Sequence, residues 1–119
     1  MGITTVRVKI HNPAMLEKCK EVEVPVDTGA VYTVVKSEIL RELGIKPLEK
    51  REFTLANGEK IERDIGGALY IVGERGGHAP IVFGVGSDQP LLGATALEAM
   101  GLQVDPISKQ LKPTELFLL

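Results

Sequence analysis

The sequence predicts an all-β fold with two short helices, and three observations support this prediction. Several segments alternate β-branched with polar residues, which is typical of half-buried strands. Thirteen glycines are spread along the 119 residues and separate these segments, as turn-forming residues do. The hydrophobic fraction of 44% is enough to form a core. Because this length fits one folding unit, we expect a single domain over residues 1–119.

The first three strands are predicted from apolar patterns. Val6, Val8 and Ile10 alternate with charged residues within the segment 4–10, and a second alternating segment covers 20–26. We expect these two strands to pair as a hairpin. The run 31–35 has few polar positions, so we expect a strand in the interior of a sheet.

A short helix and a hairpin are expected next. Ser37 is a good N-cap and Gly44 a good C-terminal stop, so a helix is predicted over 38–43 with one apolar face. Asn57-Gly58 between two strand-like segments is a strong signal for a two-residue hairpin turn in which both residues have positive φ. The hairpin is expected to run from Phe53 to Ile61.

The C-terminal half continues the same pattern. Strands are predicted over 68–72 and 79–85, then a helix over 94–100 that Gly101 ends, then a small hairpin around Asp105-Pro106. The apolar tail 116–119 is expected either to pair with a second copy of the chain or to pack on its own subunit.

Composition excludes several classes of function. The net charge is -2, and aromatic residues make up only 4% of the chain, so neither a basic surface nor a stacking platform for nucleic acid is predicted. No apolar run approaches the roughly 20 residues of a membrane span. The one cysteine excludes an internal disulfide framework, and the N-terminus does not read as a signal peptide. We therefore expect a cytoplasmic protein that binds neither nucleic acid nor membranes.

The sharpest motif is Asp27-Thr28-Gly29-Ala30, which follows the apolar segment Val24-Pro25-Val26. An aspartate at this point lies where the chain leaves a strand, and the glycine permits a tight turn. Together with Leu91-Leu92-Gly93-Ala94, this motif resembles the retroviral-type (retropepsin-like) aspartic proteases, and the short helix resembles their cellular and prokaryotic relatives. The resemblance covers Val6 to Lys112 and implies an acid protease barrel.

The resemblance implies an aspartic endopeptidase with Asp27 as its catalytic residue. Such enzymes use two carboxylates that share a proton, one as a base toward water and one as an acid toward the carbonyl oxygen. Since Asp-Thr-Gly occurs once, the family's solution is a homodimer in which two chains each supply Asp27. Thr28, Gly29 and Ala30 would support this active site. Ala30 stands where pepsin-like enzymes often have Ser, which implies activity closer to neutral pH.

The resemblance also implies a substrate site. The hairpin 53–61 corresponds to the flap, the hairpin that covers a bound peptide in these enzymes, and its candidate substrate-binding residues are Leu55, Ala56, Asn57, Gly58, Glu59 and Lys60. Leu92 and Gly93 are expected to form a pocket wall. The expected substrate is an extended peptide or protein segment with apolar side chains near the cleaved bond. No metal or other cofactor is implied.

Two alternatives stay open. The flap tip is more polar than in the viral enzymes, so the chain is alternatively a catalytically weak or inactive peptide-binding or dimerisation module of the same fold. It is also compatible with an unrelated small β-barrel in which Asp27 only forms a turn. Other candidate residues are assigned to loops or the surface, because none has the partners that a metal site, a serine hydrolase or a thiol protease needs: His11, His78, Cys19, Ser87, Asp64, Asp88 and Asp105.

Overall fold

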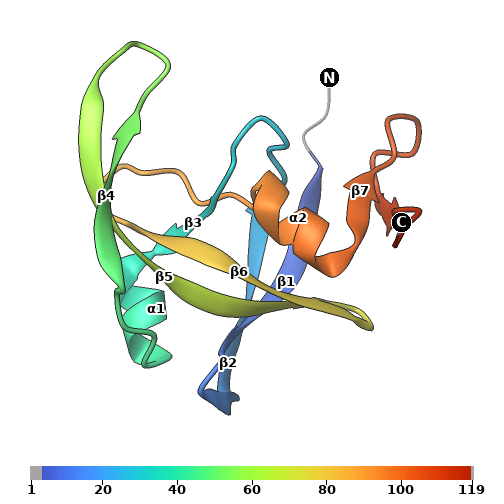
Figure 1. Ribbon diagram of the computed structural model, residues 1–119, viewed down its shortest axis with the longest axis horizontal. Helices are drawn as coiled ribbons and strands as arrows, with labels where there is room; N and C mark the ends of the chain where they lie inside the picture. The colour runs from blue at the N-terminus through green and yellow to red at the C-terminus, as the bar shows by residue number, and fades with distance from the viewer. Residues whose placement is uncertain (1–3, 119) are drawn as a thin grey trace.

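The computed structural model describes residues 4–118, which form strands and two short helices (Figure 1). The elements follow one another as β1 (Thr5–Asn12), β2 (Met15–Pro25), β3 (Thr33–Lys36), α1 (Ser37–Glu42), β4 (Glu49–Thr54), β5 (Lys60–Val72), β6 (Arg75–Gly84), α2 (Ala94–Met100), β7 (Leu102–Val104) and β8 (Leu111–Pro113). The predicted all-β class is confirmed. Neither helix of the described residues is long and apolar enough to cross a membrane.

The main sheet has the strand order β2-β1-β5-β6-β3, and β4 pairs with the first part of β5. All neighbours are antiparallel except β3 and β6, which are parallel. Strands β7 and β8 form a separate two-stranded sheet. The expected closed barrel is not formed within residues 4–118, because β2 and β3 lie at opposite ends of the strand order.

The long strand β5 connects the flap to the rest of the sheet. It pairs with β4 as far as Ile65 and with β1 from Leu69 onward. Gly66 lies at the change of partner, where a Cβ atom would come within 3.0 Å of the Lys46 carbonyl oxygen. Small residues here let the strand pass close to the chain after α1, and the β4–β5 hairpin extends beyond the sheet (Figure 1).

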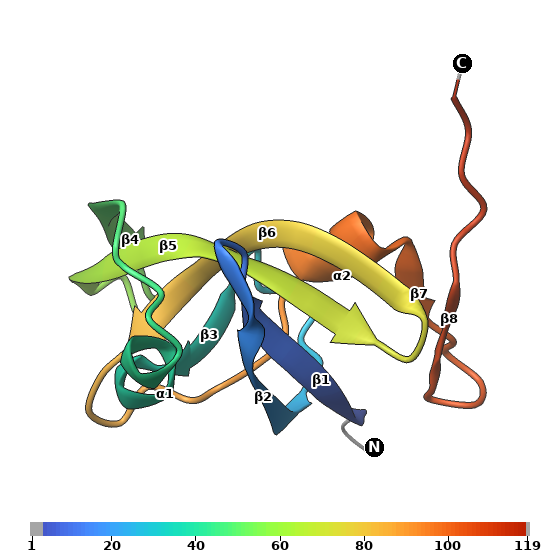
Figure 2. The same ribbon diagram turned by 90° about the horizontal axis from the view of Figure 1, so that it is seen from below.

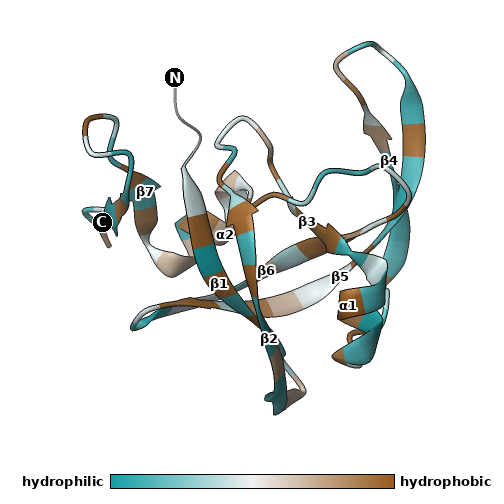
Figure 3. Ribbon diagram, turned by 180° about the vertical axis from the view of Figure 1, so that it is seen from behind, coloured by the Kyte–Doolittle hydropathy of each residue, from teal (hydrophilic) through white to brown (hydrophobic). Residues whose placement is uncertain are grey.

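The core lies between the curved sheet and the two helices. It includes Ile10, Tyr70, Ile81 and Phe83, each at most 1% exposed. Helix α2 packs on β6, while the distal half of the β1–β2 hairpin and much of the β4–β5 hairpin are hydrophilic (Figure 3). The site described below therefore lies beside this core rather than inside it.

The expected β1–β2 hairpin is confirmed, but the expectation for β3 is wrong in one respect. β3 is the last strand in the order and begins at Thr33, and Val31 is exposed. Within residues 4–118, the outer edge of β3 pairs only through a bridge in which Val34 and Leu91 exchange two hydrogen bonds of 3.0 Å each. The apolar sequence of this edge strand is explained by burial of its side chains, since Val35 is 2% exposed and Val34 is half-buried.

The glycines that end both helices are predicted correctly, whereas the N-cap of α1 is not. Gly44 and Gly101 have φ of 75° and 69° and end the two helices, as expected. Ser37 is not an N-cap, because it is the first helical residue and its hydroxyl binds Glu38 instead. Strand β3 runs directly into α1, so no residue between them is free to cap it.

The flap turn also differs from the expected type. Of the two turn residues Asn57 and Gly58, only Gly58 has positive φ, at 88°. The Gly58 amide donates to the Leu55 carbonyl, and the Leu55 amide donates to the Glu59 carbonyl. A three-residue turn of this kind ends with a glycine in the left-handed region, so Asn57 does not need that conformation.

The C-terminal tail does not pack on its own subunit over residues 116–118. Leu116, Phe117 and Leu118 are 68–99% exposed. Figure 2 shows the tail extending away from the sheet beyond β8. The part of the expected segment at Leu119 lies outside the described residues.

Candidate active site

Asp27 is held by main-chain hydrogen bonds to the segment around Leu92. The chain leaves β2 at Pro25, and Val26 forms a parallel bridge with Leu92. The Leu92 amide donates to the Pro25 carbonyl at 2.8 Å, and the Asp27 amide donates to the Leu92 carbonyl at 2.9 Å. Because Leu92 is fully buried, these bonds fix the backbone of Asp27 to the core.

The side chain of Asp27 shapes its own loop. Its Oδ1 accepts a hydrogen bond of 2.9 Å from the Gly29 amide, and its carbonyl accepts one of 3.1 Å from the Ala30 amide. A Cβ atom at Gly29 would lie 3.2 Å from Asp27 Oδ1, so glycine leaves room for this contact. Asp27, Thr28 and Gly29 are exposed in the single chain.

The segment after the Asp27 loop is attached to the start of α2. The Ala94 amide donates to the Ala30 carbonyl at 2.8 Å, and the Gly93 amide donates to the buried Thr33 hydroxyl oxygen at 3.0 Å. A Cβ atom at Gly93 would lie 2.5 Å from the carbonyl carbon of Tyr32. Only glycine allows this approach, so the two predicted motifs, 27–30 and 91–94, meet in space.

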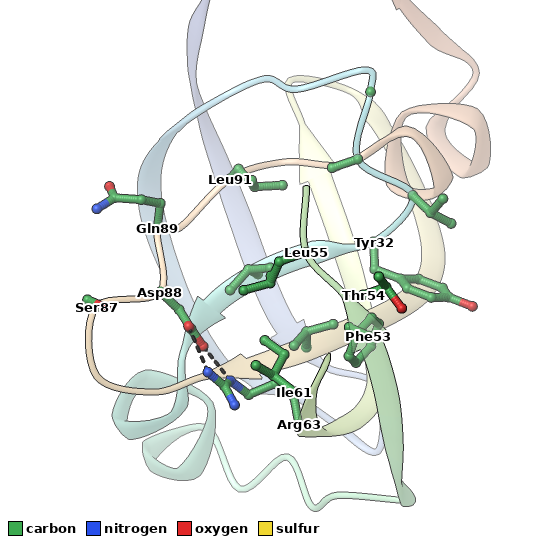
Figure 4. Close-up of a pocket in the computed structure, with 15 residues that line it drawn as sticks. Tyr32, Phe53, Thr54, Leu55, Ile61, Arg63, Ser87, Asp88, Gln89 and Leu91 are labelled. Carbon is green, nitrogen blue, oxygen red and sulfur yellow. Dashed lines mark hydrogen bonds and ion pairs between the residues drawn. The ribbon is translucent and has the colours of Figure 1, made fainter. Parts of the chain in front are cut away.

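A cavity of about 830 Å³ lies between these segments and the flap (Figure 4). Phe53, Leu55 and Ile61 line it from the flap side. Its other lining residues come from the Asp27 loop and the residues that follow it, from β3, β4, β5 and β6, and from the segment before α2: Gly29, Ala30, Val31, Tyr32, Val34, Thr54, Arg63, Val82, Ser87, Asp88, Gln89 and Leu91. Most of this wall is apolar, which suits an apolar side chain of a ligand.

The predicted site residues fall into two groups. Gly29, Ala30 and Leu55 line the cavity, whereas the flap tip Ala56–Lys60 is exposed and does not line it. Asp27 lies two residues before Gly29, the first lining residue, and does not itself line the cavity.

The expected pocket wall shifts by one residue. Leu92 and Gly93 are buried and do not line the cavity, whereas Leu91 does. Successive residues of an extended chain point to opposite sides, so Leu91 faces the cavity and Leu92 the core. Thr28 lines a second cavity of about 510 Å³ beside α2 and β7.

Sequence reasoning missed a half-buried ion pair in the cavity wall. Arg63 donates to both carboxylate oxygens of Asp88, with Nε–Oδ2 at 2.6 Å and Nη2–Oδ1 at 3.0 Å. The Val85 amide also donates to Asp88 Oδ2. The hydrogen bond from Arg63 holds the pKa of Asp88 below its ordinary value, despite the opposing effect of burial. The two residues are 25 positions apart, and no local pattern links them.

Aromatic residues of the site were also missed. The rings of Tyr32 and Phe53 meet edge to face with centroids 6.1 Å apart. The Arg51 Nη1 donates to the Tyr32 hydroxyl at 2.9 Å and its Nε donates to Glu49 at 2.6 Å. The hydrogen bond to Glu49 raises the pKa of Arg51, and the same bond lowers the pKa of Glu49. The placement of Tyr32 five residues after Asp27 was the only available signal.

Of the other candidate residues, Ser87 and Asp88 line the cavity, whereas His11, Cys19 and Asp105 lie elsewhere. Among residues 4–118 no group of three or more His, Cys, Asp and Glu side chains is placed to hold a metal ion. His11 Nδ1 donates to the Leu16 carbonyl oxygen within the β1–β2 hairpin, and Cys19 is exposed on β2. Asp105 forms a turn by accepting from the Ile107 amide.

Comparison with known proteins supports the fold. No protein-family model matches the chain, and no curated protein matches it in sequence. Among solved structures, 27 chains match. One is the solution structure of the simian foamy virus (mac) protease, with a TM-score of 0.54 and 17% sequence identity over 79% of this chain and 91% of that chain. The chain has a retropepsin-like fold. This neighbour is viral, so the kinship with cellular and prokaryotic relatives stays a prediction.

Proposed function

We propose that the protein is an aspartic endopeptidase whose catalytic dyad consists of Asp27 from two chains. The observation that carries this proposal is the exposed Asp27-Thr28-Gly29 loop, which hydrogen bonds to Leu92 fix in place beside a flap-covered cavity. The retropepsin-like fold supports the same function. A plain Asp turn would explain the bond to Gly29 but not the attachment to the core or the neighbouring cavity.

Two carboxylates of this kind act as a unit. Held close together they cannot both ionise, so one keeps a proton and the pair titrates with two joint pKa values. The ionised carboxylate takes a proton from the attacking water, while the protonated one donates a hydrogen bond to the peptide carbonyl oxygen. Proton transfer then returns a proton to the leaving amine. The hydrogen bond from the Gly29 amide to Asp27 Oδ1, on a backbone fixed to Leu92, would keep each carboxylate in the same orientation throughout.

The single Asp-Thr-Gly motif supports a homodimer, because a dyad needs two such aspartates. The chain has one Asp-Thr-Gly motif, and its loop is exposed in the single chain. The tail Leu116–Leu118 offers an exposed apolar surface, which is unusual for a monomer and suits association. We propose that two Asp27 loops meet at a two-fold axis with Thr28 beside it.

The cavity indicates the kind of substrate. A peptide in extended form would lie between the flap and the Asp27 loop, where it can form main-chain hydrogen bonds as an added strand. Val34, Ile61 and Leu91 would receive an apolar side chain next to the cleaved bond. No cofactor is part of this proposal.

The test is the substitution Asp27→Asn, with Asp105→Asn as its matched control. Both aspartates accept a hydrogen bond from the amide two residues later, at 2.9 and 3.0 Å, and asparagine keeps that acceptor. We expect Asp27→Asn to abolish cleavage of a mixed peptide library while the control keeps full activity. Equal cleavage by both variants would sink the proposal.

A second candidate is a peptide-binding module that cuts slowly or not at all. The exposed, polar flap tip Ala56–Lys60, which does not line the cavity, favours this candidate. Peptides that bind the wild-type protein and remain intact after long incubation would establish it in place of the endopeptidase.

A further inference from the structure

Two arginines face one another across the base of the flap. Arg51 of β4 and Arg63 of β5 are directly opposed in the antiparallel register, so their side chains lie on the same face of the hairpin. Like charges in this position destabilise a strand pair. We call Arg51 and Arg63 the arginine pair. Each arginine is stabilised by acceptors outside the cross-strand contact.

Arg63 is fixed to the segment that precedes α2. Its two hydrogen bonds to Asp88 are bidentate, the strongest geometry for this kind of pair. The side chains of Arg63 and Asp88 are 19% and 22% exposed, whereas every other ion pair of the described residues has a partner at least 43% exposed. The Arg63 Nη1 also donates to the Glu62 carbonyl. The Arg63–Asp88 ion pair is thus shielded from solvent, and all three guanidinium nitrogens of Arg63 donate a hydrogen bond (Figure 4).

Arg51 is fixed to the segment that follows Asp27. Its guanidinium donates to the Tyr32 hydroxyl and lies 5.9 Å from the centre of the Tyr32 ring. The Tyr32 ring in turn contacts Phe53 on the same strand as Arg51. This second connection is more exposed than the first, so its contribution is smaller.

The acceptors of the two arginines, Tyr32 and Asp88, belong to the two segments that hold the Asp27 loop. Tyr32 lies between Asp27 and Thr33, and Asp88 lies in the loop that leads to Leu92. These segments are joined to each other by the Asp27–Leu92 and Val34–Leu91 hydrogen bonds. The flap base is therefore attached to both of these segments, to the first through Arg51 and to the second through Arg63.

We propose that Arg51 and Arg63 are positioning residues that hold the base of the flap over the substrate cavity, so that only the outer part of the flap, residues 55–60, moves when a peptide enters. This inference builds on the proposed peptidase function. The pair does not touch the reacting atoms. It would act by keeping the cavity walls of the flap, Phe53 and Ile61, at a fixed separation from Leu91.

The first test measures flap position without using activity. In a Cys19→Ser background, spin labels at Glu52, next to Arg51 at the flap base, and at Glu38 on α1 report one intrachain distance when labelled chains are diluted with unlabelled ones. We expect a narrow distance distribution for the parent protein and a clearly broader one for Arg63→Gln. Arg7→Gln is the matched control, because Arg7 pairs with Glu23 through an exposed contact of 3.4 Å far from the flap.

The second test separates binding from chemistry. A charge-assisted bidentate contact is lost in Arg63→Gln, so we expect KM to rise by about tenfold with kcat changed by less than about twofold. Arg51→Gln should raise KM less, and Arg63→Lys should recover part of the loss because it keeps the charge but not the fork. A variant that is only partly folded would instead show a lower apparent kcat with an unchanged KM, because fewer of its molecules are active.

The outcomes distinguish the two proposals. If the parent protein cleaves no peptide, the peptidase proposal fails, and the distance distributions alone decide on the arginine pair. A narrow, unchanged distribution in Arg63→Gln overturns the positioning role whatever the activity. A broader distribution with a raised KM supports it, and a broader distribution with parental KM and kcat overturns it.

Discussion

Thr33→Val tests the attachment of the Asp27 loop to the start of α2. Thr33 is 1% exposed, and its hydroxyl oxygen accepts the hydrogen bond of the buried Gly93 amide at 3.0 Å. Valine has nearly the same volume as threonine, so the substitution creates no cavity. It removes the hydroxyl and leaves the Gly93 amide without its acceptor in the protein interior.

The expected cost follows from that unpaired amide. A buried donor left without an acceptor costs about 1–3 kcal/mol, a large share of the roughly 5–15 kcal/mol by which a domain is stable. For a chain of this length each kcal/mol corresponds to roughly 4 °C, so Tm should fall by roughly 4–12 °C. The Asp27 loop is attached to the same segment, so peptidase activity should fall as well.

The assay is thermal unfolding at one protein concentration and one pH, because dimerisation makes Tm depend on concentration. Thr33→Ser serves as the control, since it keeps the hydroxyl acceptor and loses only a methyl group, at about 1 kcal/mol. We expect the valine variant to be the less stable of the two. A valine variant that unfolds at the wild-type Tm would refute the role assigned to this hydrogen bond.

Two further predictions concern the same segments. Gly93→Ala should destabilise the protein by at least about 1–3 kcal/mol, because its Cβ would lie 2.5 Å from the Tyr32 carbonyl carbon; urea unfolding of a soluble variant with wild-type midpoint would contradict this. The lowered pKa of Asp88 predicts a stabilising contribution that is complete above its ordinary value of 3.8 and is lost as pH falls from there through the lower folded-state value. The difference in unfolding free energy between the wild-type protein and Asp88→Asn should therefore shrink as pH falls below that ordinary value, and a difference that stays constant or grows would disprove the assignment.

The sequence was sufficient for features that depend on local chemistry. Alternating valines predicted β1 and β2, and Gly44 and Gly101 predicted the helix ends, because each signal is contained within a few residues. Asn57-Gly58 located the flap hairpin correctly. Its turn type was wrong because the strands accommodate a three-residue turn, which needs positive φ only at the glycine.

Features that depend on long-range contacts could not be predicted from local patterns in the sequence. The bond between Arg63 and Asp88 joins residues 25 apart, and nothing near either residue distinguishes it from a surface charge. The choice between Leu91 and Leu92 as cavity wall depends on which side of the chain faces the core, and two adjacent leucines carry no information on that point. The open sheet likewise follows from the pairing of β5 with three strands rather than from any one segment.

The most direct test of the dyad is a mixing experiment between wild-type and Asp27→Asn chains. The two are mixed at constant total concentration and allowed to exchange subunits, and peptidase activity is followed against the wild-type fraction. If each active site needs Asp27 from both chains, activity varies as the square of that fraction, so an equal mixture shows about a quarter of the wild-type activity. An equal mixture that retains about half of it would show that one chain is sufficient and would contradict the dyad.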